Sequence, residues 1–546
     1  MAMDIDRRNF VVGGTALAGI ALASNALAAG ETEACFAEVR QGKLRGERRN
    51  GVDIYRAIPY AGSVSGANRF REAPPPPKWA GVRDATQLGA PAMQPRGGTF
   101  GIREPAPSED CLFLNIWTPS GGGRGKPVMV YSHGGGFTSG SGGAAGQDGA
   151  NLARENDVVV VATNHRLGLL GFLYLDEIAG RDYAGSGNRG VQDIAFALRW
   201  ISRNVAAFGG DPRNVTIFGE SGGGAKTSCL YAMPQAAAYF HKASIESGPG
   251  VRMMTKDAAA ETTRQLLATL GIAPRDWRKL LNVPASRLLE MQTALGRSAG
   301  GPAPAADDPR QGVGRGGGGF APVVDGHILP HHPFDPVAPT MSRDKPLIVG
   351  GNQDEQMFFA VERRDADAWK LSGEGLKQRL RERFGDRADA IEAAYRSERP
   401  EATPTDLYFA VFSDAFSGVG SNVIAERKLR QGGAPVFRYL FAYQRGGRAM
   451  PGVDAEMGAA HALDIPVKFN NVAGRLAGSR AERIAAGANM SRLWASFART
   501  GKPSAPGVPE WPAYDLSRRP VMVIDSTCHV EDDPRPAERK VWGQLS

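Results

Sequence analysis

The 546-residue sequence predicts an α/β protein in which helices cover both faces of a central, mostly parallel β-sheet. Short runs of apolar, β-branched residues recur along the chain, as expected for strands that are buried on both faces. Helical stretches lie between these runs, so strand and helix alternate. The sequence shows no repeat of solenoid length, which favours one large unit over an array.

The expected strands are short and rich in valine, isoleucine and aromatic residues. They are "KPVMVYS" (126–132), "NDVVVVATN" (156–164), "NVTIFG" (214–219), "KASIES" (242–247), "KPLIVGG" (345–351) and "VFRYLFAY" (436–443). Before the third strand, the stretch 190–208 places Ile194, Leu198 and Ile201 at helical spacing. This spacing predicts a partly buried helix that connects two strands.

The composition is that of an ordinary globular protein, with 42% hydrophobic and 22% charged residues. Lysine and arginine exceed aspartate and glutamate by 65 to 57, which gives a formal net charge of +8. The chain has no block of five like charges and no nucleic-acid-binding motif. We therefore interpret the excess charge as a scattered basic surface and expect no nucleic-acid partner.

The N-terminal residues have the pattern of an export signal. Arg7 and Arg8 precede an apolar stretch (10–22), and "ALA" (26–28) has the A-x-A form of a cleavage site. Paired arginines are typical of bacterial twin-arginine signals. We expect a signal peptide at residues 1–28 and a periplasmic or secreted protein.

The alternative for this segment is a short membrane anchor. Glycines interrupt the apolar stretch, however, and it is shorter than the ~20 residues that span a bilayer. No other segment is long and apolar enough, so we expect no membrane span after signal cleavage. Residues 29–546 are expected to form a single domain, in which the glycine-rich and proline-rich segment 296–319 is a flexible loop.

The sequence predicts neither a metal site nor a cofactor. It has no C-x-x-C motif and no clustered His/Cys spacing. The cysteines are too few for a disulfide scaffold, although an exported protein can form one or two bridges. They are Cys35, Cys111, Cys229 and Cys528.

Ser221 lies in "TIFGESGGGAKTS" (216–228), at the centre of a G-x-S-x-G motif. In so glycine-rich a chain about 0.5 such matches are expected by chance, so the context must decide. A strand ends directly before Ser221 and small residues follow, as in the strand–turn–helix of a nucleophile elbow. Gly219 and Gly223 lack side chains where strand and helix pass closely. This context predicts that Ser221 is a nucleophile rather than an ordinary turn serine.

A serine nucleophile also needs donors for the oxyanion that develops when it attacks. The segment "SHGGGFTSG" (132–140) follows a predicted strand, and its glycines can turn backbone N–H groups toward an alkoxide. We expect His133 to shape this turn rather than to transfer protons.

Longer motifs accompany these two. They are "YRAIPYA" (55–61), "SEDCLFLNIWTP" (108–119), "NHRLGLLGFL" (164–173), "AAFGGDPRNVTIFGESGGG" (206–224) and "WPAY" (511–514). Together they resemble the type B carboxylesterases, an α/β-hydrolase family that includes para-nitrobenzyl esterases, cholinesterases and the non-catalytic neuroligins. The resemblance extends from about Gly42 to Trp542. It implies the α/β-hydrolase fold and serine-dependent hydrolysis of a small-molecule ester.

The resemblance also implies site residues. It places the nucleophile at Ser221, the acid at Glu355 in "GGNQDEQMFF" (350–359) and the base at His461 in "GAAHALDIPVKF" (458–469). The order Ser, Glu, His is that of α/β-hydrolases. The implied oxyanion donors are the backbone amides of Gly135, Gly136 and Gly222. Ser247 takes the place of a family serine that supports the triad acid.

Other residues compete for two of these roles. Asp354 is beside Glu355, but the two side chains leave an extended chain on opposite sides. Asp464 follows the histidine too closely to reach across the site. His331 and His332 precede the acid and so do not fit the order of the triad.

The chain departs from the family at several positions. It reads "GAPAMQ" (89–94) where the family usually has a cysteine, so Cys111 lacks its usual partner. Gln356 replaces a glycine after the acid, and Lys226 stands where small residues are common. Lys226 is about 500° around a helix from Ser221, which does not fit a Ser-x-x-Lys mechanism.

Two other functions use the same fold. A binding or adhesion protein needs no complete triad, whereas an amidase or a tannin-type or feruloyl-type esterase keeps the mechanism and changes the leaving group. The complete triad favours an enzyme. Phe137, Phe358 and Phe359 are candidates for an apolar substrate pocket or for the core. The sequence predicts neither the substrate nor the oligomeric state.

Overall fold

The computed structural model describes residues 32–95, 104–298, 319–444 and 455–544 without 474, 475 and 477, and also residues 446, 449, 451 and 453. The expected signal peptide lies outside the described residues, as does most of the segment 296–319. Residues 296–298 of that segment end helix α8 (Ala285–Ser298), so the predicted loop starts too early. No helix within the described ranges is long and apolar enough to cross a membrane.

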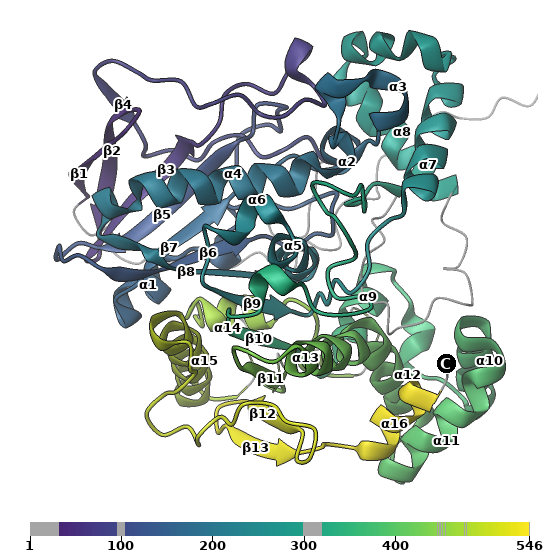
Figure 1. Ribbon diagram of the computed structural model, residues 1–546. Helices are drawn as coiled ribbons and strands as arrows, with labels where there is room; N and C mark the ends of the chain where they lie inside the picture. The colour runs from purple at the N-terminus through teal and green to yellow at the C-terminus, as the bar shows by residue number, and fades with distance from the viewer. Residues whose placement is uncertain are drawn as a thin grey trace, which may run out of the picture.

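One sheet of 13 strands forms the centre of the protein (Figure 1). Its order is β1-β2-β3-β5-β7-β6-β8-β9-β10-β11-β12-β13, and β4 pairs with β2. From β7 to β12 in this order neighbouring strands are parallel, whereas the two edges of the path are antiparallel. The strands are β1 (Glu33–Val39), β2 (Gly42–Arg49), β3 (Val52–Pro59), β4 (Val82–Asp84), β5 (Phe113–Pro119), β6 (Lys126–Ser132), β7 (Val159–Thr163), β8 (Gly210–Glu220), β9 (Lys242–Glu246), β10 (Leu347–Asn352), β11 (Val436–Phe441), β12 (Pro520–Ile524) and β13 (His529–Asp532).

The six predicted strands correspond to β6, β7, β8, β9, β10 and β11, which together with β12 form the parallel part of the sheet. Their side chains are buried on both faces because successive residues of a strand point to opposite sides. In β6, Val130 packs in the core that contains α4 (Arg189–Asn204), whereas Tyr131 packs in the core that contains α15 (Arg480–Thr500). The prediction of a mostly parallel sheet between two helical layers is therefore confirmed.

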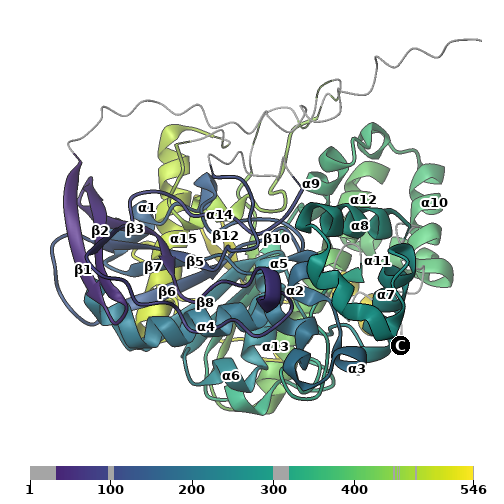
Figure 2. The same ribbon diagram turned by 90° about the horizontal axis from the view of Figure 1, so that it is seen from above.

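The helices form these two layers and a further group. Figure 2 shows α1 and α15 on one side of the sheet and α4, α6 and α13 on the other. Helices α9–α12 and α16 enclose an apolar core of their own. The bounds of these helices and of the others are α1 (Ala150–Asn156), α2 (Gly168–Phe172), α3 (Asp176–Ala179), α5 (Gly222–Tyr231), α6 (Pro234–Ala237), α7 (Lys256–Thr269), α9 (Glu355–Glu362), α10 (Gly373–Phe384), α11 (Ala388–Glu398), α12 (Pro404–Ser413), α13 (Val419–Gln431), α14 (Asp464–Lys468) and α16 (Pro536–Gln544).

All four cysteines are buried, free thiols. Cys111, which the family resemblance would pair with a second cysteine, is fully enclosed in the core. Burial raises the pKa of the Cys111 thiol, so it packs as a small apolar group.

Candidate active site

Ser221 lies between β8 and α5 in a strained backbone conformation. Its φ is 59° and its ψ is −125°, a combination that side-chain-bearing residues rarely adopt. Two backbone hydrogen bonds hold it there: Ser221 N–H donates to Glu246 O at 2.8 Å, and Ala225 N–H donates to Ser221 O at 3.1 Å. The turn therefore fixes the direction of the hydroxyl, as a nucleophile elbow requires.

The glycines that flank Ser221 are required by close packing. A Cβ atom on Gly219 would lie 2.5 Å from the carbonyl carbon of Gly223, and a Cβ on Gly223 would lie 2.0 Å from Ser132 O. Real Cβ atoms are not found at such distances, so β6, β8 and α5 meet this closely only because both positions are glycine.

The structure brings the three predicted triad residues into one chain of hydrogen bonds. Ser221 Oγ is 2.8 Å from His461 Nε2, and His461 Nδ1 is 2.5 Å from Glu355 Oε2. Ser221 follows β8, Glu355 begins α9 directly after β10, and His461 lies in the loop before α14. The carboxyl ends of two parallel strands thus supply the nucleophile and the acid at one edge of the sheet.

The other oxygen of Glu355 is held by two donors. Glu355 Oε1 accepts hydrogen bonds from the Asn352 backbone N–H and from the Ser417 hydroxyl, each at 2.9 Å. Ser247, which the family resemblance assigns to this role, is buried directly after β9. Its hydroxyl forms no hydrogen bond with any described residue. The hydroxyl that contacts the acid is therefore that of Ser417, which the sequence analysis missed.

Ser417 reaches the acid from an irregular turn of a long helix. Between α12 and α13 the chain forms a π-helical turn, Asp414–Gly418. Such turns are rare and occur often at functional sites. This turn places Ser417 against Glu355, and it places the ring of Phe416 5.0 Å from that of His461.

The two competing carboxylates have other partners. Asp354 Oδ2 accepts the backbone N–H of Ala459 at 2.8 Å. Asp464 lies 3.3 Å from the ammonium of Lys468 and accepts from the Asn352 amide at 3.3 Å. Neither carboxylate forms a hydrogen bond with His461, whereas Glu355 does.

The three predicted oxyanion donors lie on two segments that touch. Gly135 and Gly136 have φ values of 83° and 61°, in the region that favours glycine. Gly222 is the first residue of α5, and a Cβ there would lie 2.1 Å from Gly136 O. None of the three N–H groups donates a hydrogen bond to another described residue, so all three are available to a ligand.

Glu220 adds a second ionisable carboxyl group beside His461, and no sequence motif pointed to it. It is buried directly before the nucleophile, and its Oε1 lies 3.3 Å from His461 Nε2. Burial alone lowers the pKa of His461, but Glu220, Glu355 and Asp464 outweigh it and raise this pKa. In turn, burial outweighs the opposite effect of the nearby His461 and raises the pKa of Glu220 to about 8. The two groups therefore titrate as a coupled pair.

Three phenyl rings surround the histidine. The ring centroids of Phe358, Phe359 and Phe416 lie 5.6, 5.0 and 5.0 Å from that of His461. All three side chains are half-buried, so they present apolar surface beside the reacting groups. Phe137 differs because it is buried in the core against Phe172.

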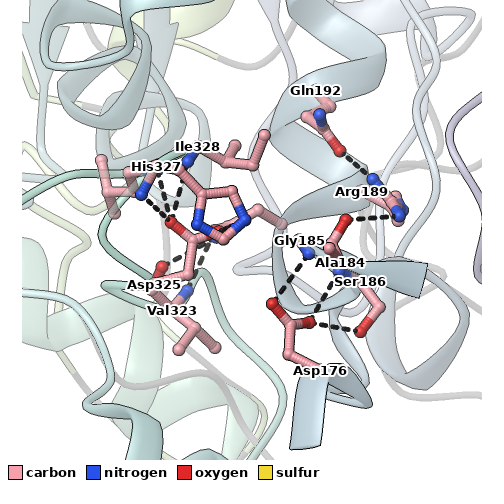
Figure 3. A network of polar contacts seen from close by, with 12 residues as sticks. Asp176, Ala184, Gly185, Ser186, Arg189, Gln192, Val323, Asp325, His327 and Ile328 are labelled. Atoms are coloured by element: carbon pink, nitrogen blue, oxygen red, sulfur yellow. Dashed lines mark hydrogen bonds and ion pairs between the residues drawn. The ribbon is translucent and has the colours of Figure 1, made fainter. Parts of the chain in front are cut away.

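A second polar cluster contains none of the triad residues (Figure 3). Asp176, Asp325 and His327 bring possible metal-ligand atoms within 4.8 Å of one another. The carboxylates, however, are already occupied: Asp325 Oδ1 accepts backbone N–H groups from residues 327–329 at 2.9–3.0 Å, and Asp176 accepts the N–H groups of Gly185 and Ser186. This network joins two loops, and we assign it a structural role.

Comparisons with known proteins place this geometry in a family. The sequence matches the profile of the Carboxylesterase family over residues 33–542. It is 34% identical to para-nitrobenzyl esterase of Bacillus subtilis (strain 168) over 508 residues, which covers 91% of this chain and 96% of that protein. It is 33% identical to phenmedipham hydrolase of Pseudarthrobacter oxydans over 510 residues, 90% of this chain and 94% of that one.

Solved structures agree with the sequence relatives. The crystal structure of carboxylesterase EST55 from Geobacillus stearothermophilus matches with a TM-score of 0.78 and 35% identity, covering 93% of this chain and 99% of that chain. A structure of a thermophilic para-nitrobenzyl esterase matches with a TM-score of 0.76 and 31% identity over the same shares. The chain therefore belongs to the carboxylesterase family and is a carboxylic ester hydrolase.

Proposed function

We propose that this protein cleaves esters through a Ser221–His461–Glu355 triad and a covalent acyl-enzyme. The observation that carries the proposal is the continuous pair of hydrogen bonds, 2.8 Å from Ser221 Oγ to His461 Nε2 and 2.5 Å from His461 Nδ1 to Glu355 Oε2. Nucleophile, base and orienting acid are thus within the distances that proton transfer requires.

In the first half-reaction, Ser221 Oγ attacks the ester carbonyl carbon while His461 Nε2 accepts the hydroxyl proton. The carbonyl oxygen becomes an oxyanion that the N–H groups of Gly135, Gly136 and Gly222 stabilise. The carbon–oxygen bond to the leaving group then breaks, and His461 gives its proton to the departing alcohol. Glu355 holds the imidazole in the required tautomer and stabilises its positive form.

In the second half-reaction, a water molecule replaces the alcohol. His461 accepts a proton from the water as its oxygen attacks the acyl carbon, and the same oxyanion donors act again. The bond from the acyl carbon to Ser221 Oγ breaks, Oγ recovers the proton, and the carboxylic acid leaves.

The test is substitution of the nucleophile together with covalent labelling. Ser221→Ala should reduce kcat for a p-nitrophenyl ester by at least about 10⁴-fold while the thermal unfolding midpoint stays close to that of the wild type. An alkyl fluorophosphonate should add one phosphonyl group to Ser221 in the wild type, detected by peptide mass spectrometry. Activity of the variant above one-hundredth of the wild-type value, or a label on another residue, would contradict the proposal.

The substrate class follows from the phenyl rings beside His461. We expect esters with an apolar or aromatic group, because Phe358, Phe359 and Phe416 present half-buried rings at 5.0–5.6 Å from the imidazole. The name of the para-nitrobenzyl esterase relative indicates a benzyl group in its substrate. A panel that compares benzyl with short alkyl esters of the same acid tests this: kcat/KM should be higher for the benzyl esters, and equal values would contradict the assignment.

We also propose export by the twin-arginine route, with residues 1–28 removed and 29–546 acting as one catalytic domain. Arg7, Arg8 and the A-x-A pattern at 26–28 support this proposal. The mature N-terminus should lie near Ala29, and Arg7→Lys with Arg8→Lys should abolish export. Recovery of the uncleaved, folded chain from the cytoplasm of its native host would argue against it.

A further inference from the structure

Lys226 is completely buried in helix α5, which begins directly after the nucleophile Ser221. It lies on α5 one turn after Gly222 and Gly223, and none of its surface is exposed. Its ammonium Nζ donates a hydrogen bond to His133 O at 3.0 Å. It forms no ion pair with any carboxylate of the described residues. Burial of an amine with one hydrogen-bond acceptor, and with the Phe137 ring centroid 5.9 Å away, costs free energy.

The carbonyl that Lys226 binds belongs to the start of the segment 132–140, here called the glycine loop. His133 is followed by the glycines that carry the proposed oxyanion donors, and its ring stacks on His165 with centroids 4.4 Å apart. The far end of this loop is held by Gln94, whose side-chain oxygen accepts the Gly140 N–H at 2.8 Å and whose amide donates to Gly140 O at 2.9 Å. Side chains from outside the loop thus fix both of its ends.

The proposed oxyanion site depends on the placement of this loop relative to α5. Gly135 and Gly136 belong to the loop, whereas Gly222 belongs to the helix, so three N–H groups converge only if the two segments keep one relative position. Residues three and four apart lie on the same face of a helix. Gly222, Gly223 and Lys226 therefore present one face of α5 to the loop, with two close backbone approaches and one hydrogen bond.

We infer that Lys226 is a positioning residue that holds the glycine loop against α5 and thereby aligns the amides of Gly135 and Gly136 with that of Gly222. The inference rests on the proposed function, because it assigns a role to the same oxyanion site. Burial lowers the pKa of Lys226 to about 7, but a neutral amine also donates hydrogen bonds, so the contact persists when the group titrates.

The test is Lys226→Met, an unbranched apolar side chain one heavy atom shorter than lysine, which removes the donor. For an ester with the wild-type Ser221 present, kcat should fall about 10- to 100-fold, because misplaced oxyanion donors act mainly in the transition state. KM should change by less than about threefold. Affinity for a trifluoromethyl ketone, which forms an oxyanion adduct with Ser221, should fall by a similar factor, whereas the product alcohol should bind unchanged.

Lys428 offers a matched control. It is also a completely buried lysine, and its Nζ donates to the backbone carbonyls of Ser342 at 3.0 Å and Arg343 at 2.5 Å and to Gln431 Oε1 at 3.1 Å. Ser342 precedes β10, whereas Glu355 follows it. The Lys428 contact therefore lies toward the amino end of β10 and the triad at its carboxyl end. Because it breaks three hydrogen bonds, Lys428→Met should reduce stability at least as much as Lys226→Met, and it should leave kcat and ketone affinity unchanged.

Lys226→Gln is a polar second variant in case the methionine variant does not fold. Its amide nitrogen lies one atom closer to the backbone than Nζ, so we expect it to lose the hydrogen bond to His133 O, with the same loss of kcat and ketone affinity. If either folded variant keeps kcat and ketone affinity within about twofold of the wild type, or if Lys428→Met loses kcat equally, the inference is overturned. Failure of the proposed function itself is separate, since Ser221→Ala would then remain active.

Discussion

Glu355 and Asp354 are neighbours in sequence and differ in what they contact. The Glu355 carboxylate is 2.5 Å from His461 Nδ1, whereas Asp354 binds the Ala459 backbone. Both carboxylates are held by the segment around the histidine, so each contributes to the position of that loop. Only Glu355, however, can fix the tautomer of the imidazole.

We therefore expect Glu355→Gln to reduce kcat by about 10⁴-fold, because the wrong tautomer and an unsupported imidazolium both slow the reaction. Steady-state kinetics with a p-nitrophenyl ester measure this, and circular dichroism checks that the variant is folded. Asp354→Asn and Asp464→Asn are the controls and should lose far less activity. If Glu355→Gln kept more than about a tenth of the wild-type kcat and Asp354→Asn did not, Asp354 would be the acid.

Glu220 gives the site a distinct pH dependence. Its negative charge 3.3 Å from His461 Nε2 stabilises the protonated imidazole and so raises the pKa of His461. Catalysis requires neutral His461, so kcat/KM should rise with pH through the pKa of the coupled pair. Glu220→Gln removes the charge, lowers this pKa and should move the acid limb of the profile to lower pH by about one unit.

The pH–rate profile of kcat/KM, recorded at constant ionic strength, measures this shift. Glu220→Asp is the control, because it keeps the negative charge and should keep the acid limb closer to that of the wild type. An acid limb that is the same in Glu220→Gln and in the wild type would show that Glu220 does not set the pKa of His461.

At the scale of elements, the irregular helix between α12 and α13 supports the triad from one side. A π-helical turn contains an extra residue relative to an α-helical turn, so it changes which side chains face the site. Here it directs Ser417 to Glu355 and Phe416 to His461. Helix α12 also docks onto α9, since the Gln356 N–H donates to Ser413 Oγ at 3.0 Å.

Ser417→Ala should reduce kcat about tenfold with little change in KM. It removes one of the two donors to Glu355 Oε1, and a hydrogen bond to a charged group is worth roughly 1.5–3 kcal/mol. Ester kinetics and thermal unfolding provide the measurement. Ser421→Ala is the matched control, because this buried serine of α13 has a hydroxyl without a hydrogen-bond partner in the described chain.

Ser247→Ala separates the contact seen in the structure from the role that the family resemblance implies. The Ser247 hydroxyl does not bind Glu355, so its removal should reduce kcat less than Ser417→Ala does. A larger loss in Ser247→Ala than in Ser417→Ala would show that Ser247 supports the acid during turnover.

At the scale of the whole molecule, a buried charge network links strand β9 of the sheet to helices α14 and α15. Lys468 of α14 forms ion pairs with Glu246 of β9 and, at 3.3 Å, with Asp464. Glu246 also accepts hydrogen bonds from the Ser244 hydroxyl and the Trp494 indole, each at 2.7 Å. All of these groups are completely buried, so each depends on its partners to offset the loss of water.

Lys468→Met should lower the free energy of unfolding by about 3–5 kcal/mol, because it leaves two buried carboxylates without their cation. Urea unfolding at pH 7, analysed by linear extrapolation, measures the loss. Adding Glu246→Gln to Lys468→Met should restore part of the stability, because it removes one of the unpaired charges. A single variant as stable as the wild type would mean that the network contributes nothing to folding.

The sequence by itself determined the features that depend on local patterns. Apolar runs predicted the parallel centre of the sheet, because burial on both faces requires them. The elbow at Ser221 was predicted from Gly219 and Gly223, because the lack of a side chain at a glycine can be read directly from the sequence. Glu355 and His461 were predicted only through ordered motifs resembling a known family, and the structure brings both to Ser221.

Tertiary structure alone decided which side chains support these groups. Ser417 lies 62 residues from Glu355, and Lys226 lies 93 residues from the carbonyl that it binds. No periodicity or motif connects such pairs, because their contact depends on how separate elements pack. Glu220 is next to the nucleophile, yet its effect on His461 arises from a distance of 3.3 Å across the site. The physical reason is the same in each case: hydrogen bonds and charge interactions depend on separation in space, which the order of residues does not specify.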